Sequence, residues 1–121
     1  MKSTINVLDG VIRITPCNPL DDAEMEALIS HCQPVFDENY GTAYIVLINL
    51  GKSIRLSTGA VQIAKKLFEA YRHSIKEMVF IISDRGYAKI VELSLMRSSI
   101  RNFTIFMSED EAERAIRATS A

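Results

Sequence analysis

The sequence has few glycines and few cysteines, and it has no long apolar run. Its 121 residues include five glycines, which leaves little material for a glycine-rich loop around a nucleotide phosphate. The two cysteines, Cys17 and Cys32, have neither the number nor the spacing of a disulfide framework or a metal motif, so we expect two free thiols. The apolar run Tyr44–Ile48 is far too short to cross a bilayer, which takes about 20 apolar residues.

The start of the chain also lacks the apolar core of a signal peptide. Met1-Lys2-Ser3-Thr4 leads directly into a strand-like pattern. With 48% hydrophobic and 24% charged residues, the composition is that of an ordinary globular protein. We therefore expect a cytoplasmic protein, without membrane insertion, that forms a single domain over residues 1–121.

Motifs of catalytic centres are missing from the sequence. There is no GxSxG, HExxH or CxxC motif. His31 and His73 fall in different predicted helices without a carboxylate or cysteine at a functional spacing, and we expect them at the surface or at helix ends. Asp84 follows a buried strand, where a helix cap explains it. We therefore expect a protein that is not an enzyme, with no catalytic residue, metal ligand or cofactor.

Charge is distributed unevenly along the chain, although the net charge is only −1. Residues 1–50 carry a charge of −5, residues 51–101 carry +6, and residues 102–121 carry −2. Two interpretations of the basic middle segment are open. Its side chains face an acidic partner or a phosphate, or they form solvated helix faces whose charge is balanced by the acidic first helix. Aromatic residues are not interleaved with the basic ones, so we expect no nucleic-acid partner.

The first third of the chain predicts a β-hairpin followed by a helix. Residues Thr4–Leu8 and Val11–Thr15 alternate polar and apolar side chains, and Asp9-Gly10 between them is a strong hairpin signal. Asp21 with Glu24 forms a capping-box pattern at a helix start. Apolar residues then follow at helical spacing, before a proline that either ends or kinks the helix: Met25, Leu28, Ile29, Cys32 and Pro34.

The remainder of the chain predicts three further strand–helix pairs. Residues Ala43–Asn49 and Met78–Ile82 are apolar without alternation, which indicates strands covered on both faces. The helices are expected to start near Ser57, after Ser83 or Asp84, and after Ser108 with Glu111; a last strand covers Asn102–Phe106, and the tail after Ala118 is expected to fray. Their apolar faces are assigned to Ala60, Ile63, Ala64, Leu67, Ala70 and Tyr71, to Tyr87, Ile90, Val91 and Leu95, and to Ala112, Ala115 and Ile116.

This order, β-β-α-β-α-β-α-β-α, defines the predicted fold class. It is an α/β fold with a mixed, mostly parallel β-sheet flanked by helices, and its strand–helix–strand units cross over right-handed.

Ser57-Thr58-Gly59 is the most informative short segment, because it places two hydroxyls at a helix start after a buried strand. A helix N-terminus accommodates a phosphate readily. Ser57 is explained by a helix cap alone. A glycine in the first turn weakens a helix, so Gly59 favours a second role in which another backbone or a phosphate approaches closely. Both interpretations, a cap alone and a cap that also serves docking or modification, remain open.

The buried strand ending in Asn49-Leu50, the loop, Ser57-Thr58-Gly59 and the following apolar-faced helix resemble the STAS domain. That family comprises anti-sigma factor antagonists and the cytoplasmic domains of sulphate transporters. The resemblance covers residues 4–117, and a small bacterial group of STAS/SEC14-type proteins is similar to the same extent. It implies a STAS-like fold and a regulatory protein-interaction module.

In the antagonists the pattern is Asp-Ser-Ser-Gly, and a partner kinase phosphorylates the first serine. Matched on Gly59, the first serine of this pattern falls on Ser57 and the second on Thr58. The resemblance therefore implies Ser57, with Thr58 beside it, as phosphorylation candidates and an anti-sigma-type kinase as the protein partner. Leu56 stands where the family has aspartate. Residues near the corner become candidates for partner or phosphate contact: Lys52, Arg55, Gly59 and Gln62.

An alternative function is the binding of a small lipid or nucleotide, as in a STAS/SEC14-like protein of unassigned function. A homodimer, through the edge of the opening hairpin or an apolar helix patch, is compatible with either function.

Overall fold

The computed structural model describes residues 3–17, 22–38, 41–51 and 59–120. Its elements, in chain order, are β1 (Thr4–Leu8), β2 (Val11–Thr15), α1 (Asp22–Glu38), β3 (Tyr44–Gly51), α2 (Gly59–Tyr71), the 3₁₀ turn η1 (Arg72–Ser74), β4 (Ile75–Ile82), α3 (Arg85–Arg97), β5 (Phe103–Phe106) and α4 (Glu109–Ser120). The predicted order of strands and helices is confirmed. β3 and β4 are longer than predicted, because their ends continue as strand beyond the purely apolar core.

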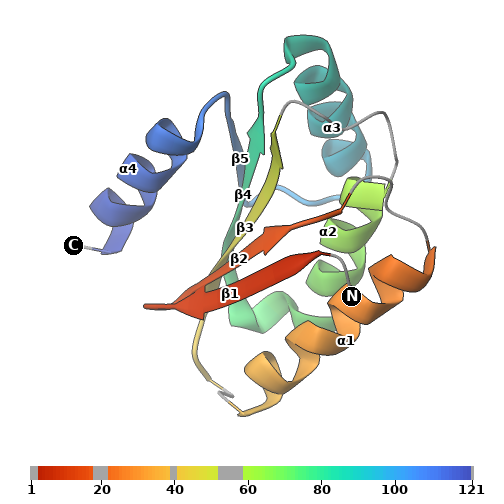
Figure 1. Cartoon of the computed structure of the whole chain (residues 1–121), viewed down its shortest axis with the longest axis vertical. Helices are drawn as coiled ribbons and strands as arrows, with labels where there is room; N and C mark the ends of the chain where they lie inside the picture. The colour runs from red at the N-terminus through yellow and green to blue at the C-terminus, as the bar shows by residue number, and fades with distance from the viewer. Residues whose placement is uncertain (1–2, 18–21, 39–40, 52–58, 121) are drawn as a thin grey trace.

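The five strands form one sheet in the order β1-β2-β3-β4-β5 (Figure 1). β1 pairs antiparallel with β2, and the pairs β2–β3, β3–β4 and β4–β5 are parallel. The mixed, mostly parallel α/β fold predicted from the sequence is therefore confirmed. β3 lies in the middle of the sheet, and the burial of its first five residues on both faces explains why its sequence does not alternate.

The opening hairpin turns at Asp9 and Gly10, as the sequence predicts. Both residues have positive φ, 52° and 76°. Two consecutive residues with positive φ are what a type I′ turn requires, and this turn matches the twist of the flanking strands. The turn places Leu8 opposite Val11 and thereby sets the pairing of the whole hairpin.

One face of the sheet is covered by α1, α2 and α3, which lie together on the same side (Figure 1). The core on this face is continuous from β2 to β4. Its fully buried large side chains come from strands and helices alike: Ile12, Ile14, Leu28, Phe36, Ile48, Leu67, Met78, Phe80, Ile82, Leu95 and Ile100. Phe36 of α1 stacks on Tyr71 of α2 with ring centroids 4.3 Å apart, which joins the ends of the two helices.

The opposite face is covered by α4 (Figure 1). Ala112 and Ile116 of this helix pack on Val11, Ile45, Leu47, Val79 and Ile81 of the sheet, with Phe106 beside them. The helix is also held by Arg13 of β2, whose guanidinium donates two hydrogen bonds, of 3.0 and 2.9 Å, to the Glu113 carboxylate. α4 therefore combines a small apolar contact with a polar one. No helix in the described part of the chain is long and apolar enough to cross a membrane.

The structure corrects several details of the predicted helices. α1 continues through Pro34 to Glu38, so the proline does not end it. Ala70 and Ile90 were assigned to buried helix faces, but Ala70 is exposed and Ile90 is 52% exposed. Both lie at the margins of their helices' apolar faces, where periodicity alone does not separate covered from uncovered positions. The last helix extends to Ser120, beyond Ala118, where the sequence predicts its ordered part to end.

Candidate functional site

The carboxyl ends of the parallel strands meet at one edge of the sheet. β3 and β4 run in the same direction and end together there (Figure 1). In open α/β sheets, ligands characteristically bind outside the carboxyl ends of the strands, where loops and helix N-termini converge. We refer to the ends of β3 and β4, with the residues that follow them, as the carboxyl edge.

Four of the six predicted site residues, Lys52, Arg55, Ser57 and Thr58, lie outside the described residues. The described structure fixes both sides of this segment. Before it, β3 ends at Gly51, and after it α2 begins at Gly59. Gln62, on the first turn of α2, is exposed, as its predicted role in partner contact requires.

Gly51 ends β3 in a conformation that favours glycine. Its φ is +56°, in the left-handed region. The carbonyl of Gly51 accepts a 3.3 Å hydrogen bond from the backbone N–H of Ser83, just beyond β4. The pairing of β3 with β4 shifts register between Asn49 and Gly51. This bond therefore joins the two strand ends where the regular ladder is interrupted.

Asp84 caps α3, which resolves the predicted alternative of Ser83 or Asp84. Its Oδ1 accepts a 2.9 Å hydrogen bond from the backbone N–H of Tyr87. At Gly86 a Cβ would approach this same oxygen to 3.3 Å, so the glycine leaves room for the cap. The Asp84 carboxylate at the carboxyl edge is therefore explained by the start of the helix.

Two hydrogen bonds that the sequence did not indicate join Ser3 to Cys17, just after β2, and to Glu24 of α1. The backbone N–H of Ser3 donates to Glu24 Oε2 at 3.0 Å, and the Ser3 Oγ accepts from the backbone N–H of Cys17 at 2.8 Å. Ser3 is only 5% exposed, and among the described residues it is the polar one that is buried. Its two contacts lie far away along the chain, so no local pattern points to them.

Three basic residues of the middle segment lie exposed on helices: Lys66, Lys89 and Arg85. Lys66 of α2 forms an ion pair of 3.4 Å with Glu26 of α1, and Lys89 forms one of 3.3 Å with Glu92 within α3. These lysines match the predicted alternative of solvated helix faces, and Lys66 is balanced by the acidic first helix. Arg85, at the start of α3, is exposed at the carboxyl edge.

The other candidate residues considered in the sequence lie apart from this edge. His31 and His73 are exposed on α1 and η1, as predicted. Cys17 is half-buried and Cys32 is buried, both as free thiols. Within residues 3–17, 22–38, 41–51 and 59–120, no group of three or more His, Cys, Asp or Glu side chains is arranged to hold a metal ion.

Comparison with known proteins supports the fold class defined above. The chain is similar to the protein TM1081, whose NMR structure superposes with a TM-score of 0.56 over 93% of this chain and 86% of that chain. The two sequences are 19% identical, so this likeness shows the fold alone. No protein-family model matches the sequence, and no curated protein matches it.

Proposed function

We propose that this protein is a non-enzymatic, cytoplasmic regulatory module that binds a protein partner at the carboxyl edge, in the manner of an anti-sigma factor antagonist. One observation carries the proposal: Ser57 and Thr58 fall between the end of the central strand β3 and the start of α2. This is the position of the phosphorylated serine in the STAS pattern that the sequence resembles. The exposed Gln62 extends the proposed contact surface along α2.

The proposed switch depends on the charge of one phosphate group. Phosphorylation of Ser57 or Thr58 adds about −1.5 to −2 charges at neutral pH. The N-terminus of α2 stabilises that charge within the protein, because a helix N-terminus is the positive end of its dipole. Lys52 and Arg55 are close enough in sequence to add a second stabilising contribution. Repulsion and desolvation then fall on the interface with the partner, which is released.

A kinase assay and a binding assay together test the proposal. The protein is incubated with an anti-sigma-type kinase from the same genome and ATP, and intact-mass spectrometry is expected to find one added phosphate that is lost in the double variant Ser57→Ala/Thr58→Ala. Calorimetry is expected to find that Ser57→Asp weakens kinase binding by about ten-fold or more. Ser99→Asp is the matched control, because Ser99 is exposed with φ of +63°, a conformation that aspartate tolerates. No added mass, together with unchanged binding of Ser57→Asp, contradicts the proposal.

The alternative, a small lipid or nucleotide ligand, has a candidate place in the described structure. A groove of about 450 Å³ between the ends of α1 and α2 has a suitable volume, and its lining includes Asp37 and Glu69 as well as Arg72 and His73. Because carboxylates and a guanidinium line it together, its charge does not select for the phosphate of a nucleotide or phospholipid. Native mass spectrometry of the purified protein, with a retained ligand as the outcome, would favour this alternative.

A further inference from the structure

A cavity of about 150 Å³ lies between the sheet and α4, on the face opposite α1, α2 and α3. Ile45, Val79 and Phe106 form most of its apolar wall on the sheet side, and Ala115 and Ile116 close it on the helix side. Ala112 and Ile116 of α4 pack on the sheet, and Ala115 lines the open space beside them.

A carboxylate from β4 points to the chemistry of this cavity. Glu77 lines the cavity, and its Oε1 accepts a 2.8 Å hydrogen bond from the Thr104 hydroxyl of β5. An ionised carboxylate accepts up to about four hydrogen bonds, so the one from Thr104 leaves acceptor capacity. In the part of the chain that the structure describes, Glu77 has no ion-pair partner. A half-buried carboxylate of this kind favours a cation beside it.

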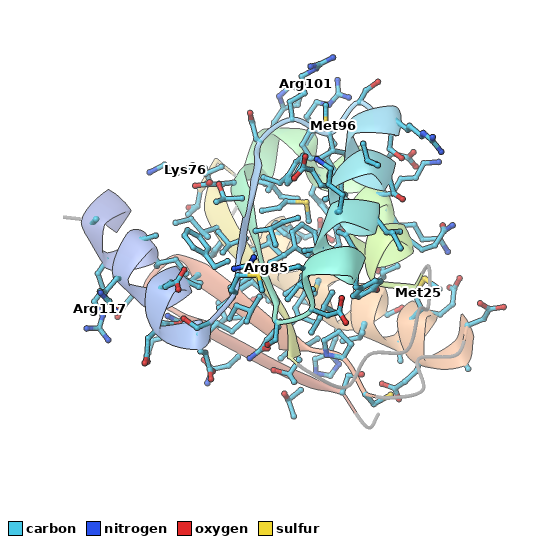
Figure 2. The ribbon with its side chains drawn as sticks, turned by 90° about the horizontal axis from the view of Figure 1, so that it is seen from above. Met25, Lys76, Arg85, Met96, Arg101 and Arg117 are labelled. Atoms are coloured by element: carbon cyan, nitrogen blue, oxygen red, sulfur yellow. The ribbon has the colours of Figure 1, made fainter. Side chains whose placement is uncertain are left out.

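Neither Arg13 nor Arg117 supplies that charge. Arg13 is already paired with Glu113. Arg117, one residue beyond the cavity-lining Ile116, extends from the outer side of α4, away from the sheet (Figure 2). A metal ion is also a poor match, because Ca²⁺ takes about six to eight oxygen ligands and the cavity offers one carboxylate and one hydroxyl.

We infer that this cavity binds a small alkylammonium compound, a protonated primary amine on a stem of about four carbons. Glu77 would accept hydrogen bonds from the ammonium group, and the aromatic ring of Phe106 adds a surface that attracts cations. Ile45, Val79 and Ile116 would enclose the stem. The size is compatible, since a cavity of about 150 Å³ accommodates benzene, a molecule of about the same volume as butylammonium.

This inference does not rest on the proposed regulatory function. The cavity reaches from Ile45 and Glu77, near the amino ends of β3 and β4, to Phe106 at the end of β5, on the face of the sheet that α4 covers. Ser57 and Thr58 precede α2, which packs on the other face. An anti-sigma partner and a small amine would therefore use different faces, and failure of one proposal leaves the other standing.

Titration with three matched probes, followed by ¹H–¹⁵N correlation spectra, tests the inference. n-Butylammonium chloride is expected to give saturable shifts at the amides of Glu77, Thr104 and Ala115. n-Butanol, which has the same stem without the charge, is expected to bind about ten-fold more weakly or worse, and sodium butyrate not to bind. No saturable shift with n-butylammonium, or equal binding of n-butanol, overturns the inference.

Two variants separate the contribution of the Glu77 charge from that of the cavity volume. Glu77→Gln keeps the shape of the side chain and is expected to weaken n-butylammonium binding about ten-fold or more. Ala115→Leu keeps Glu77 but fills the cavity, and is expected to abolish binding. Ala118→Leu is its control, because Ala118 is exposed on the same helix. Spectra without ligand confirm that each variant is folded, and full binding by a folded Glu77→Gln or Ala115→Leu variant overturns the inference.

Discussion

The ion pair between Arg13 and Glu113 offers a quantitative test of how α4 is held on the sheet. It joins residues 100 positions apart, through Nε to Oε1 at 3.0 Å and Nη2 to Oε2 at 2.9 Å. Such a paired geometry is stronger than a single contact, because two charge-assisted hydrogen bonds share one fixed orientation. The side chains are 32% and 27% exposed, so solvent screens part of the attraction.

Replacing Glu113 by Gln keeps the size of the side chain and removes its charge. Hydrogen bonds to charged groups contribute about 1.5–3 kcal/mol, and exposed ion pairs about 0–1 kcal/mol. For this partly exposed pair we expect Glu113→Gln to lower the free energy of unfolding by about 1 kcal/mol. That corresponds to a decrease of about 4 °C in Tm for a domain of this size. Urea unfolding monitored by circular dichroism measures the loss.

The free energy of unfolding lost in Glu113→Gln depends on pH in a direction that the structure predicts. The hydrogen bonds from Arg13 lower the pKa of the Glu113 carboxyl in the folded protein. The stabilisation from Glu113 is therefore fully present above the carboxyl's unfolded pKa of about 4.3, and is lost as the pH falls through the lower folded pKa. Bonding to Glu113 raises the pKa of Arg13, so Arg13 stays charged throughout this range. The difference between wild type and Glu113→Gln is expected to be constant from pH 8 to about pH 5 and to shrink below it.

Glu26→Gln is the matched control, because Glu26 forms a single, longer contact of 3.4 Å with Lys66 and is 72% exposed. It is expected to change stability by a few tenths of a kcal/mol at most. A double-mutant cycle with Arg13→Gln then isolates the energy of the pair. If Glu113→Gln costs no more than Glu26→Gln, or if the effects of Arg13→Gln and Glu113→Gln simply add, the pair does not hold α4 and the reasoning is refuted.

Two further predictions concern Gly51 and the cysteines. Gly51→Ala is expected to lower the free energy of unfolding by about 1 kcal/mol, since φ of +56° is strained for a residue with a Cβ; a urea midpoint equal to wild type would exclude that strain. Burial raises the pKa of the Cys32 thiol to about 11, so at pH 8 a thiol reagent such as DTNB is expected to modify the half-buried Cys17 first and Cys32 at least about 100-fold more slowly. In the variant Cys17→Ser the remaining thiol is Cys32, so stopped-flow absorbance of this variant measures the slow rate directly. A fast reaction would contradict the burial of Cys32.

Local signals in the sequence account for most of the fold. Asp9-Gly10 specifies the hairpin because only a few residue pairs suit two consecutive positive φ values. The Asp84 cap follows from a short side chain placed before a helical pattern. The continuous apolar run of β3 predicts a central parallel strand, since a strand covered on both faces has no reason to alternate.

The features that the sequence did not predict all depend on contacts between distant residues. The spacing of apolar residues identifies the apolar face of α3 but not how wide the covered part of that face is. Whether Ile90 is covered depends on which residues pack beside it in the folded protein, and it is 52% exposed. Nothing local shows that α4 crosses to the other face of the sheet, or that Glu113 meets Arg13. Of the candidate site, the sequence predicts the position between β3 and α2, but the hydrogen bond from the Ser83 N–H to the Gly51 carbonyl requires the folded structure.

The weak apolar contact of α4 connects the ion pair to the cavity. Ala112 and Ile116 are the buried apolar residues of this helix, whereas each of the other helices faces a larger core. Burial of one alanine and one isoleucine side chain contributes only a few kcal/mol, so a loss of about 1 kcal/mol at Glu113 is a large fraction of what keeps α4 in place. Because Ala115 and Ile116 close the cavity, we expect Glu113→Gln to weaken n-butylammonium binding although Glu113 does not line it. The same variant should change binding at the carboxyl edge less, since the described link between that edge and α4 is an exposed hydrogen bond of 3.5 Å from the Asn49 amide to the Glu109 carboxylate.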